Sequence, residues 1–226
     1  MRYEVDTILL APYRAVYVET PKVACTSIKT ALAAILGISL RATGGDPHGV
    51  AWPTAERSSS PSGRLFPGLF TFAFIRNPWD RLVSCYRDKI RGEVDGYTYC
   101  TIRPGVANCL ARFDAFVPGM SFADFVTAVA SIHDEEADGH FRSQYTFVTD
   151  GEGKISVDFL GRFERLAEDF RLVQERIGLP RNALPWLQKA RNVARYTHFY
   201  TKETRQIAGE RFRQDIDMFG YEFGTA

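Results

Sequence analysis

The stretch AVYVETPKVACTSIKTALAAILG, residues 15–37, constrains the fold more than any other part of the chain. Residues 15–19 combine β-branched and aromatic side chains, which predicts a short buried strand of a parallel sheet. Residues 27–36 carry apolar side chains at the spacing of one helix face, and Gly37 follows at the position of a C-terminal cap. The stretch therefore predicts a strand, a loop and a helix in direct succession.

The loop TPKVACT between this strand and this helix is predicted to bind an anion. A loop that enters a helix presents backbone N–H groups at the positive end of the helix dipole. Lys22 adds a mobile positive charge, and Thr26 and Ser27 add hydroxyl donors. Because the chain has no GxxxxGK[ST] sequence, this is not a Walker A loop. The alternative is an ordinary turn with a solvated lysine, and Cys25 is interpreted as a small filler residue rather than a nucleophile.

A second strand-to-helix junction follows in FTFAFIRNPWDRLVSCYRDKI. Residues 70–75 are a continuous apolar run, typical of a central parallel strand, and the Asn-Pro pair supplies an N-cap and a first helical residue. Arg76 stands at the strand end, where a planar guanidinium suits a terminal phosphate. Ser84 adds a hydroxyl two turns into the helix, and Arg81 is expected to form ion pairs on the helix surface.

The remaining chain alternates irregular sections with regular elements. Residues 41–68, rich in Gly, Pro and Ser, and residues 92–119 are predicted to be irregular. His48, in the first section, is either an exposed loop histidine or a general base over the site. The polar residues His140, Arg142 and Gln144 are either substrate contacts or solvated loop residues. Further helices are predicted at 121–129, 166–177 and 201–219, and a strand at 155–159.

Composition indicates one globular domain over residues 1–226, with 45% apolar and 24% charged residues. A net charge of +1 gives no indication of an extended nucleic-acid or anionic-membrane surface. The chain shows neither a signal peptide nor a run of about 18 apolar residues, so a cytoplasmic protein without an integral membrane segment is expected. The four cysteines have no zinc spacing. Cys100 and Cys109 bracket a small loop, but free thiols are expected in the cytosol.

Repeated strand-helix units with anion signals at their junctions predict an α/β fold, a P-loop-like three-layer sandwich around a mainly parallel sheet. PKVACTSIK resembles the 5′-phosphosulfate loop of the sulfotransferases, and FAFIRNPWDRLVSCYRDKI resembles their 3′-phosphate motif. From about residue 15 to its end, the chain is similar to the carbohydrate-type branch, the family 2 sulfotransferases. That branch includes Golgi enzymes and many bacterial members. The short chain, without their membrane anchor and extended cysteine framework, resembles a bacterial soluble form.

The resemblance implies a donor, 3′-phosphoadenosine 5′-phosphosulfate (PAPS), and no metal. Arg76 and Ser84 would hold the 3′-phosphate. Lys22 would stabilise charge on the bridging oxygen, and a histidine would accept the acceptor's proton. His48, the only histidine between the two motifs, is favoured over His140, whose HFRxQ stretch resembles a segment near the acceptor. The residues that would hold the 5′-phosphosulfate are Lys22, Val23, Ala24, Cys25, Thr26 and Ser27.

The expected function is transfer of a sulfuryl group from PAPS to a hydroxyl of a carbohydrate, glycolipid or small-molecule acceptor. One alternative is a non-catalytic module that binds the product nucleotide 3′-phosphoadenosine 5′-phosphate (PAP). An ATP-dependent P-loop kinase is a weaker alternative, because the sequence has neither the Walker lysine-serine pair nor a clear acidic strand end to hold magnesium. Neither the acceptor nor the oligomeric state follows from the sequence.

Overall fold

The computed structural model describes residues 4–58, 60, 62–92, 105–181, 184–185 and 195–225. Contacts divide the chain into two compact units. The first comprises Met1–Arg76 and Gln144–Lys189, and the second comprises Asn77–Ser143 and Ala190–Ala226. Each unit has its own hydrophobic cluster. The expectation of a single domain stays a prediction.

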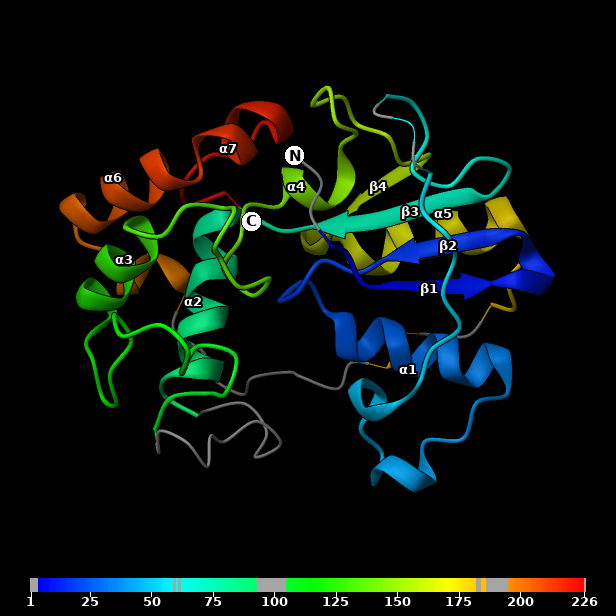
Figure 1. Ribbon diagram of the computed structural model, residues 1–226, viewed down its shortest axis with the longest axis horizontal. Helices are drawn as coiled ribbons and strands as arrows, with labels where there is room; N and C mark the ends of the chain where they lie inside the picture. The colour runs from blue at the N-terminus through cyan, green and yellow to red at the C-terminus, as the bar shows by residue number, and fades with distance from the viewer. Residues whose placement is uncertain are drawn as a thin grey trace. The chain divides into compact units, whose positions relative to one another are not determined.

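A mixed four-stranded sheet forms the centre of the first unit (Figure 1). The order in the sheet is β1-β2-β3-β4, with β2 and β3 parallel, β3 and β4 parallel, and β1 antiparallel to β2. The prediction of an α/β fold around a mainly parallel sheet is therefore confirmed. The strands are β1 (Thr7–Leu10), β2 (Ala15–Val18), β3 (Phe70–Ile75) and β4 (Phe159–Arg162).

The antiparallel strand β1 was not predicted from the sequence. It reverses into β2 through a 3₁₀ turn, Ala11–Tyr13, which Arg14 closes in the left-handed conformation with φ of 49°. Tight reversals of this kind are usually marked by Gly, Asn or Asp, since these residues tolerate positive φ. An arginine at this position gives no such signal.

Two long helices follow strands of the first unit, α1 (Cys25–Leu36) after β2 and α5 (Leu166–Ile177) after β4. Both were predicted, and both end at a glycine in the left-handed conformation, Gly37 and Gly178. A single turn, α4 (Tyr145–Val148), precedes β4. Residues of α1 and α5 share one cluster with one face of the sheet. That cluster includes Ile8, Leu10, Tyr17, Ile28, Leu32, Phe72, Phe74, Phe170 and Val173.

The strand predicted at 155–159 is displaced toward the C-terminus. Ile155 forms only an isolated bridge to Thr149 and is 47% exposed, whereas the strand paired with β3 begins at Phe159. The start is fixed by Asp158, whose backbone N–H donates to the carbonyl of Thr71 and whose carboxylate accepts from the N–H of Thr71. The bounds 155–159, which were predicted from the alternation of Ile155, Val157 and Phe159, were therefore wrong.

Four helices and a hydrophobic cluster form the described part of the second unit. The Asn77 side chain caps α2 and the Ser121 side chain caps α3, as predicted. The helix predicted at 201–219 is capped by Thr201 but breaks at Phe212, where φ is −108° and ψ is 23°. Phe212 is buried at this break. The apolar residues that predicted one continuous helix are therefore divided between two helices. The helices are α2 (Pro78–Lys89), α3 (Phe122–Ala130), α6 (Lys202–Arg211) and α7 (Arg213–Phe219).

The predicted irregular sections contain little regular structure. The described residues of 41–68 form two 3₁₀ turns, Arg41–Thr43 and Pro47–Gly49, and no helix or strand before β3. Of the second section, residues 93–104, which include Cys100, lie outside the described residues. Among the helices of the described residues, none has the length and apolar character needed to cross a membrane.

Close packing of β4 on β3 requires a glycine at position 161. A methyl group at Gly161 would lie 2.5 Å from Cδ1 of Phe74 and 3.1 Å from Cβ of Asp169. We expect Gly161→Ala to destabilise the protein by about 1–3 kcal/mol, because a buried ring would have to move. Denaturant unfolding measures this cost, and in a Phe74→Leu background the same substitution should cost less. Equal costs in both backgrounds would contradict the contact.

Candidate active site

The loop between β2 and α1 has the backbone form of an anion site. Lys22 and Ala24 both adopt left-handed φ angles, 69° and 54°. A backbone that alternates in this way curls its N–H groups toward one point, and a helix N-terminus adds its dipole. In the described part of the chain, no side chain caps α1, and its first turn has no acidic residue. The backbone of this loop therefore has the form that the sequence-based prediction of an anion site requires.

The predicted loop residues differ in exposure. Val23 is fully buried in the hydrophobic cluster of the first unit and anchors the loop to that core. Ser27 is also buried, so its hydroxyl lies below the surface of the loop. Lys22, Ala24, Cys25 and Thr26 are partly exposed, so these four residues form the accessible part of the predicted loop.

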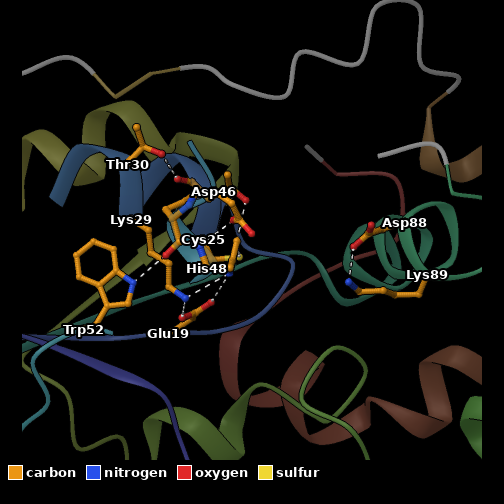
Figure 2. Close-up of polar contacts among 11 residues, drawn as sticks. Glu19, Cys25, Lys29, Thr30, Asp46, His48, Trp52, Asp88 and Lys89 are labelled. Carbon is orange, nitrogen blue, oxygen red and sulfur yellow. Dashed lines mark hydrogen bonds and ion pairs between the residues drawn. The ribbon is translucent and has the colours of Figure 1, made fainter. Parts of the chain in front are cut away.

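His48 approaches this loop from the irregular section that follows α1 (Figure 2). Its backbone N–H donates to the Asp46 carboxylate over 2.8 Å, and the Trp52 indole donates to the carbonyl of Pro47 over 2.9 Å. These bonds fix the short turn that carries the imidazole. His48 Nε2 lies 3.0 Å from the Thr26 hydroxyl oxygen. The structure thus brings the predicted histidine and the predicted loop together.

A buried ion pair lies behind His48 and was missed in the sequence (Figure 2). Lys29 Nζ is 2.5 Å from a carboxylate oxygen of Glu19 and 3.3 Å from His48 Nδ1. The second carboxylate oxygen of Glu19 is 3.9 Å from the same nitrogen. The available signals were an acidic residue at the end of a buried strand and a lysine beside apolar residues of a helix.

The donor atoms of Glu19, Cys25 and His48 lie close enough together to suggest a metal site, within 4.8 Å of one another. The ammonium of Lys29 already pairs with the Glu19 carboxylate, so the positive charge that balances this carboxylate comes from a side chain of the protein. A second group, Cys109, Asp138 and His140, has the same compactness in the second unit. The expectation of no metal stays a prediction.

Arg76, at the end of β3, contacts the loop between β2 and α1, and both belong to the first unit. Its guanidinium donates to the carbonyl of Lys22 over 3.0 Å and lies 4.0 Å above the ring of Phe163. Its backbone is held by the amide of Gln144, which accepts from the Arg76 N–H at 2.9 Å and donates to the Arg76 carbonyl at 2.8 Å. Gln144 is fully buried, so it has neither of its predicted roles, substrate contact or solvated loop residue.

Ser84 and His140 belong to the second unit. Ser84 is partly exposed on α2. His140 Nδ1 lies 2.6 Å from a carboxylate oxygen of Asp138. Burial raises the pKa of Asp138, but the hydrogen bond from His140 outweighs it and holds that pKa below its ordinary value. The ionised carboxylate accepts the Nδ1 hydrogen, which leaves the lone pair of neutral His140 on Nε2.

Two arginines hold the segment that contains His140, and neither is a surface residue. Arg81 is 2% exposed and donates to the carbonyls of Gly139 and Arg142, so the expected surface ion pair is wrong. Burial lowers the pKa of Arg81 to about 10, against the opposing attraction of Asp215. Arg211 pairs with Asp134 at 2.6 Å and donates to the Ser143 hydroxyl. The backbone of this segment is therefore rigidly placed within its unit.

Comparison with known proteins identifies the family. The sequence profile of the sulfotransferase family matches residues 6–222, so the chain belongs to this family of PAPS-dependent transferases. Human carbohydrate sulfotransferase 8 is 26% identical over 233 residues, which cover 92% of this chain and 54% of that protein. Carbohydrate sulfotransferase 14 of Danio rerio is 27% identical over 181 residues, covering 75% and 47%. The resemblance seen in the two motifs is confirmed.

An uncharacterized protein of Archaeoglobus fulgidus is 32% identical over 130 residues, which cover 58% of this chain and 82% of that protein. The chain spans about half the length of the carbohydrate sulfotransferases that it matches, 54% and 47%. No solved structure gives a significant match.

The environment of Cys25 argues against a nucleophilic thiol. Burial, followed by the nearby carboxylate of Glu19, raises the pKa of Cys25 from 9.0 to about 11. The thiolate is the reactive form of cysteine, and near neutral pH the folded protein holds about one hundredth as much of it as the unfolded chain. Folding holds this proton more tightly, so the associated stability is present below pH 9.0 and is lost as pH rises through about 11.

We therefore expect iodoacetamide to alkylate Cys25 near neutral pH at least tenfold more slowly in the folded protein than in the denatured chain, because the reactive thiolate is suppressed. Peptide mapping by mass spectrometry follows this residue separately from the other cysteines. Cys25→Ala should also retain binding of PAP. Rapid alkylation with a midpoint below pH 9.0 would contradict this assignment.

Proposed function

We propose that this chain carries the donor site and transfer site of a sulfotransferase that moves a sulfuryl group from PAPS to a hydroxyl of a carbohydrate-bearing acceptor. The observation that carries the proposal is the hydrogen bond from Arg76, which ends β3, to the carbonyl of Lys22 in the loop of the first motif; both residues belong to the first unit. The choice of a glycan, glycolipid or related small molecule rests on the names of relatives at 26% and 27% identity. The P-loop-like three-layer architecture is part of the same proposal.

The residues of the first unit fit the two anionic groups of the donor. The curled backbone from Lys22 to the start of α1, with the Thr26 hydroxyl, suits the 5′-phosphosulfate. Arg76 is proposed to hold the 3′-phosphate, because a guanidinium presents several N–H donors in a planar arrangement that suits a phosphate. For Ser84, which belongs to the second unit, a role in holding the 3′-phosphate rests on the family resemblance alone.

Lys22 is proposed to stabilise the negative charge that develops on the bridging oxygen. Transfer of a sulfuryl group, like phosphoryl transfer, depends on in-line positioning and on electrostatic stabilisation of the leaving group. The lysine ammonium supplies this charge without a change in protonation. Backbone N–H groups of the loop supply fixed dipoles that need no rearrangement during the reaction.

A histidine is proposed to accept the proton of the acceptor hydroxyl, and two residues compete for the role. Sequence position favoured His48 over His140. The hydrogen bonds favour the reverse order, because Asp138 orients His140 with its lone pair on Nε2, the arrangement of a general base. His48 instead turns Nδ1 toward the ammonium of Lys29.

The donor site is tested first by calorimetric titration with PAP, ADP and ATP. We expect the wild type to bind PAP more tightly than ADP, and Arg76→Ala to lower PAP affinity about 10–100-fold with ADP affinity unchanged, because a charged hydrogen bond to the 3′-phosphate is lost. Arg171→Ala, on the exposed face of α5, is the matched control.

Equal losses of PAP and ADP affinity would mean that Arg76 only shapes the loop through the Lys22 carbonyl. A wild type that binds no PAP would overturn the sulfotransferase proposal. Binding of ATP in place of PAP would support the kinase alternative.

The transfer role is tested with Lys22→Met. We expect turnover with radiolabelled PAPS and glycan or small-molecule acceptors to fall by about 10²–10³, because removing one electrostatic stabiliser of the transition state typically costs this much. PAP binding should remain measurable. Lys154→Met, at a lysine side chain that is 76% exposed, serves as the control.

Unchanged turnover in Lys22→Met would remove this lysine from the mechanism. PAP binding without any PAPS-dependent transfer by the wild type would favour the non-catalytic module instead.

A further inference from the structure

Four polar side chains form a continuous chain of contacts from the core of the first unit to the loop before α1. Figure 2 labels three of them, Glu19, Lys29 and His48. It begins at the buried pair of Glu19 and Lys29, whose side chains are only 6% and 9% exposed. It continues from Lys29 to Nδ1 of His48 over 3.3 Å and from Nε2 of His48 to the hydroxyl of Thr26 over 3.0 Å. Thr26 stands in the first turn of α1, where the ligand is expected.

The chemistry of lysine decides which way the hydrogens point. An ammonium group has three donors and no acceptor, so Nδ1 of His48 can meet Lys29 only as an acceptor. A neutral imidazole that accepts at Nδ1 carries its hydrogen on Nε2. An imidazolium would instead turn a Nδ1 hydrogen toward the ammonium, which like-charge repulsion disfavours.

The tautomer of His48 determines the direction of the hydrogen bond between His48 and Thr26. Because Nε2–H donates to the Thr26 oxygen, the hydroxyl hydrogen of Thr26 is left to point away from the histidine. With the opposite tautomer, Thr26 would donate to His48 and turn its oxygen lone pairs toward the anion. The Cys25 sulfur, 4.0 Å from Nε2, stays protonated near neutral pH and is a weak acceptor that does not compete.

We propose that Lys29, held by Glu19, is a positioning residue that acts through His48 to present the Thr26 hydroxyl as a hydrogen-bond donor to the anion at the loop. His48 is then a directed donor within this chain of hydrogen bonds and not the general base. The inference rests on the proposed function only for the identity of the anion, the phosphosulfate group of the donor. Hydrogen bonds that all point one way strengthen one another, which favours a fixed direction.

The tautomer is measured directly by long-range ¹H–¹⁵N spectra of the free wild-type protein above the titration of its histidines. His48→Gln identifies the His48 signals among those of the four histidines. We expect the Nε2–H tautomer in the wild type and in the control Lys154→Met. The double variant Glu19→Gln/Lys29→Met, which removes both buried charges together, should lose this preference. A wild type with the hydrogen on Nδ1 would overturn the proposal.

Binding provides a second readout that does not need the buried pair to be changed. His48→Gln keeps an N–H donor near the position of Nε2 but cannot act as a base, whereas His48→Ala removes the donor. We expect His48→Ala to lower affinity for PAP about tenfold and His48→Gln to stay close to the wild type, because one hydrogen bond is at stake. Inorganic sulfate is titrated in parallel as a simple anion.

Equal losses in the two His48 variants would overturn the donor role. In turnover assays, a Gln variant as inactive as the Ala variant would restore His48 as the base. A wild type that binds sulfate but not PAP, and still shows the His48 pattern, would overturn the proposed function while supporting this inference.

Discussion

The hydrogen bond from the Arg76 guanidinium to the carbonyl of Lys22 is the interaction on which the candidate site depends. Lys22 stands in a backbone conformation that a lysine rarely adopts, with φ of 69°. Such a residue costs on the order of 1–3 kcal/mol and persists only when its surroundings impose it. Arg76 is itself fixed by the buried amide of Gln144 and by the ring of Phe163, so the loop is shaped by three distant segments of the first unit.

Local signals in the sequence were sufficient for the elements that flank the site. The β3 strand was predicted at its observed bounds because a continuous apolar run meets an Asn-Pro helix start. The α1 and α5 helices ended where a glycine permits the left-handed conformation. The apolar run, the Asn-Pro helix start and the glycine caps each involve residues that are close together in the chain. They can therefore be recognised in a single sequence.

Features that depend on tertiary contacts were missed or misplaced. The beginning of β4 is set by Asp158 pairing with Thr71, two residues far apart in the chain. Gln144 was read as a polar loop residue, yet it is buried against the backbone of Arg76. Lys29 received no role from the sequence, and its contacts become apparent only where the fold brings Glu19 and His48 beside it. No spacing rule connects these three positions.

The left-handed pair Lys22 and Ala24 has a consequence for the transfer of such motifs between proteins. A peptide with the sequence PKVACTS would spend little time in this shape, since nothing in its own residues favours positive φ. The conformation of this loop is therefore a property of the folded unit and not of the motif sequence alone. The same motif in another protein is expected to adopt this conformation only if that protein also supplies a donor equivalent to Arg76 for the carbonyl of the motif lysine.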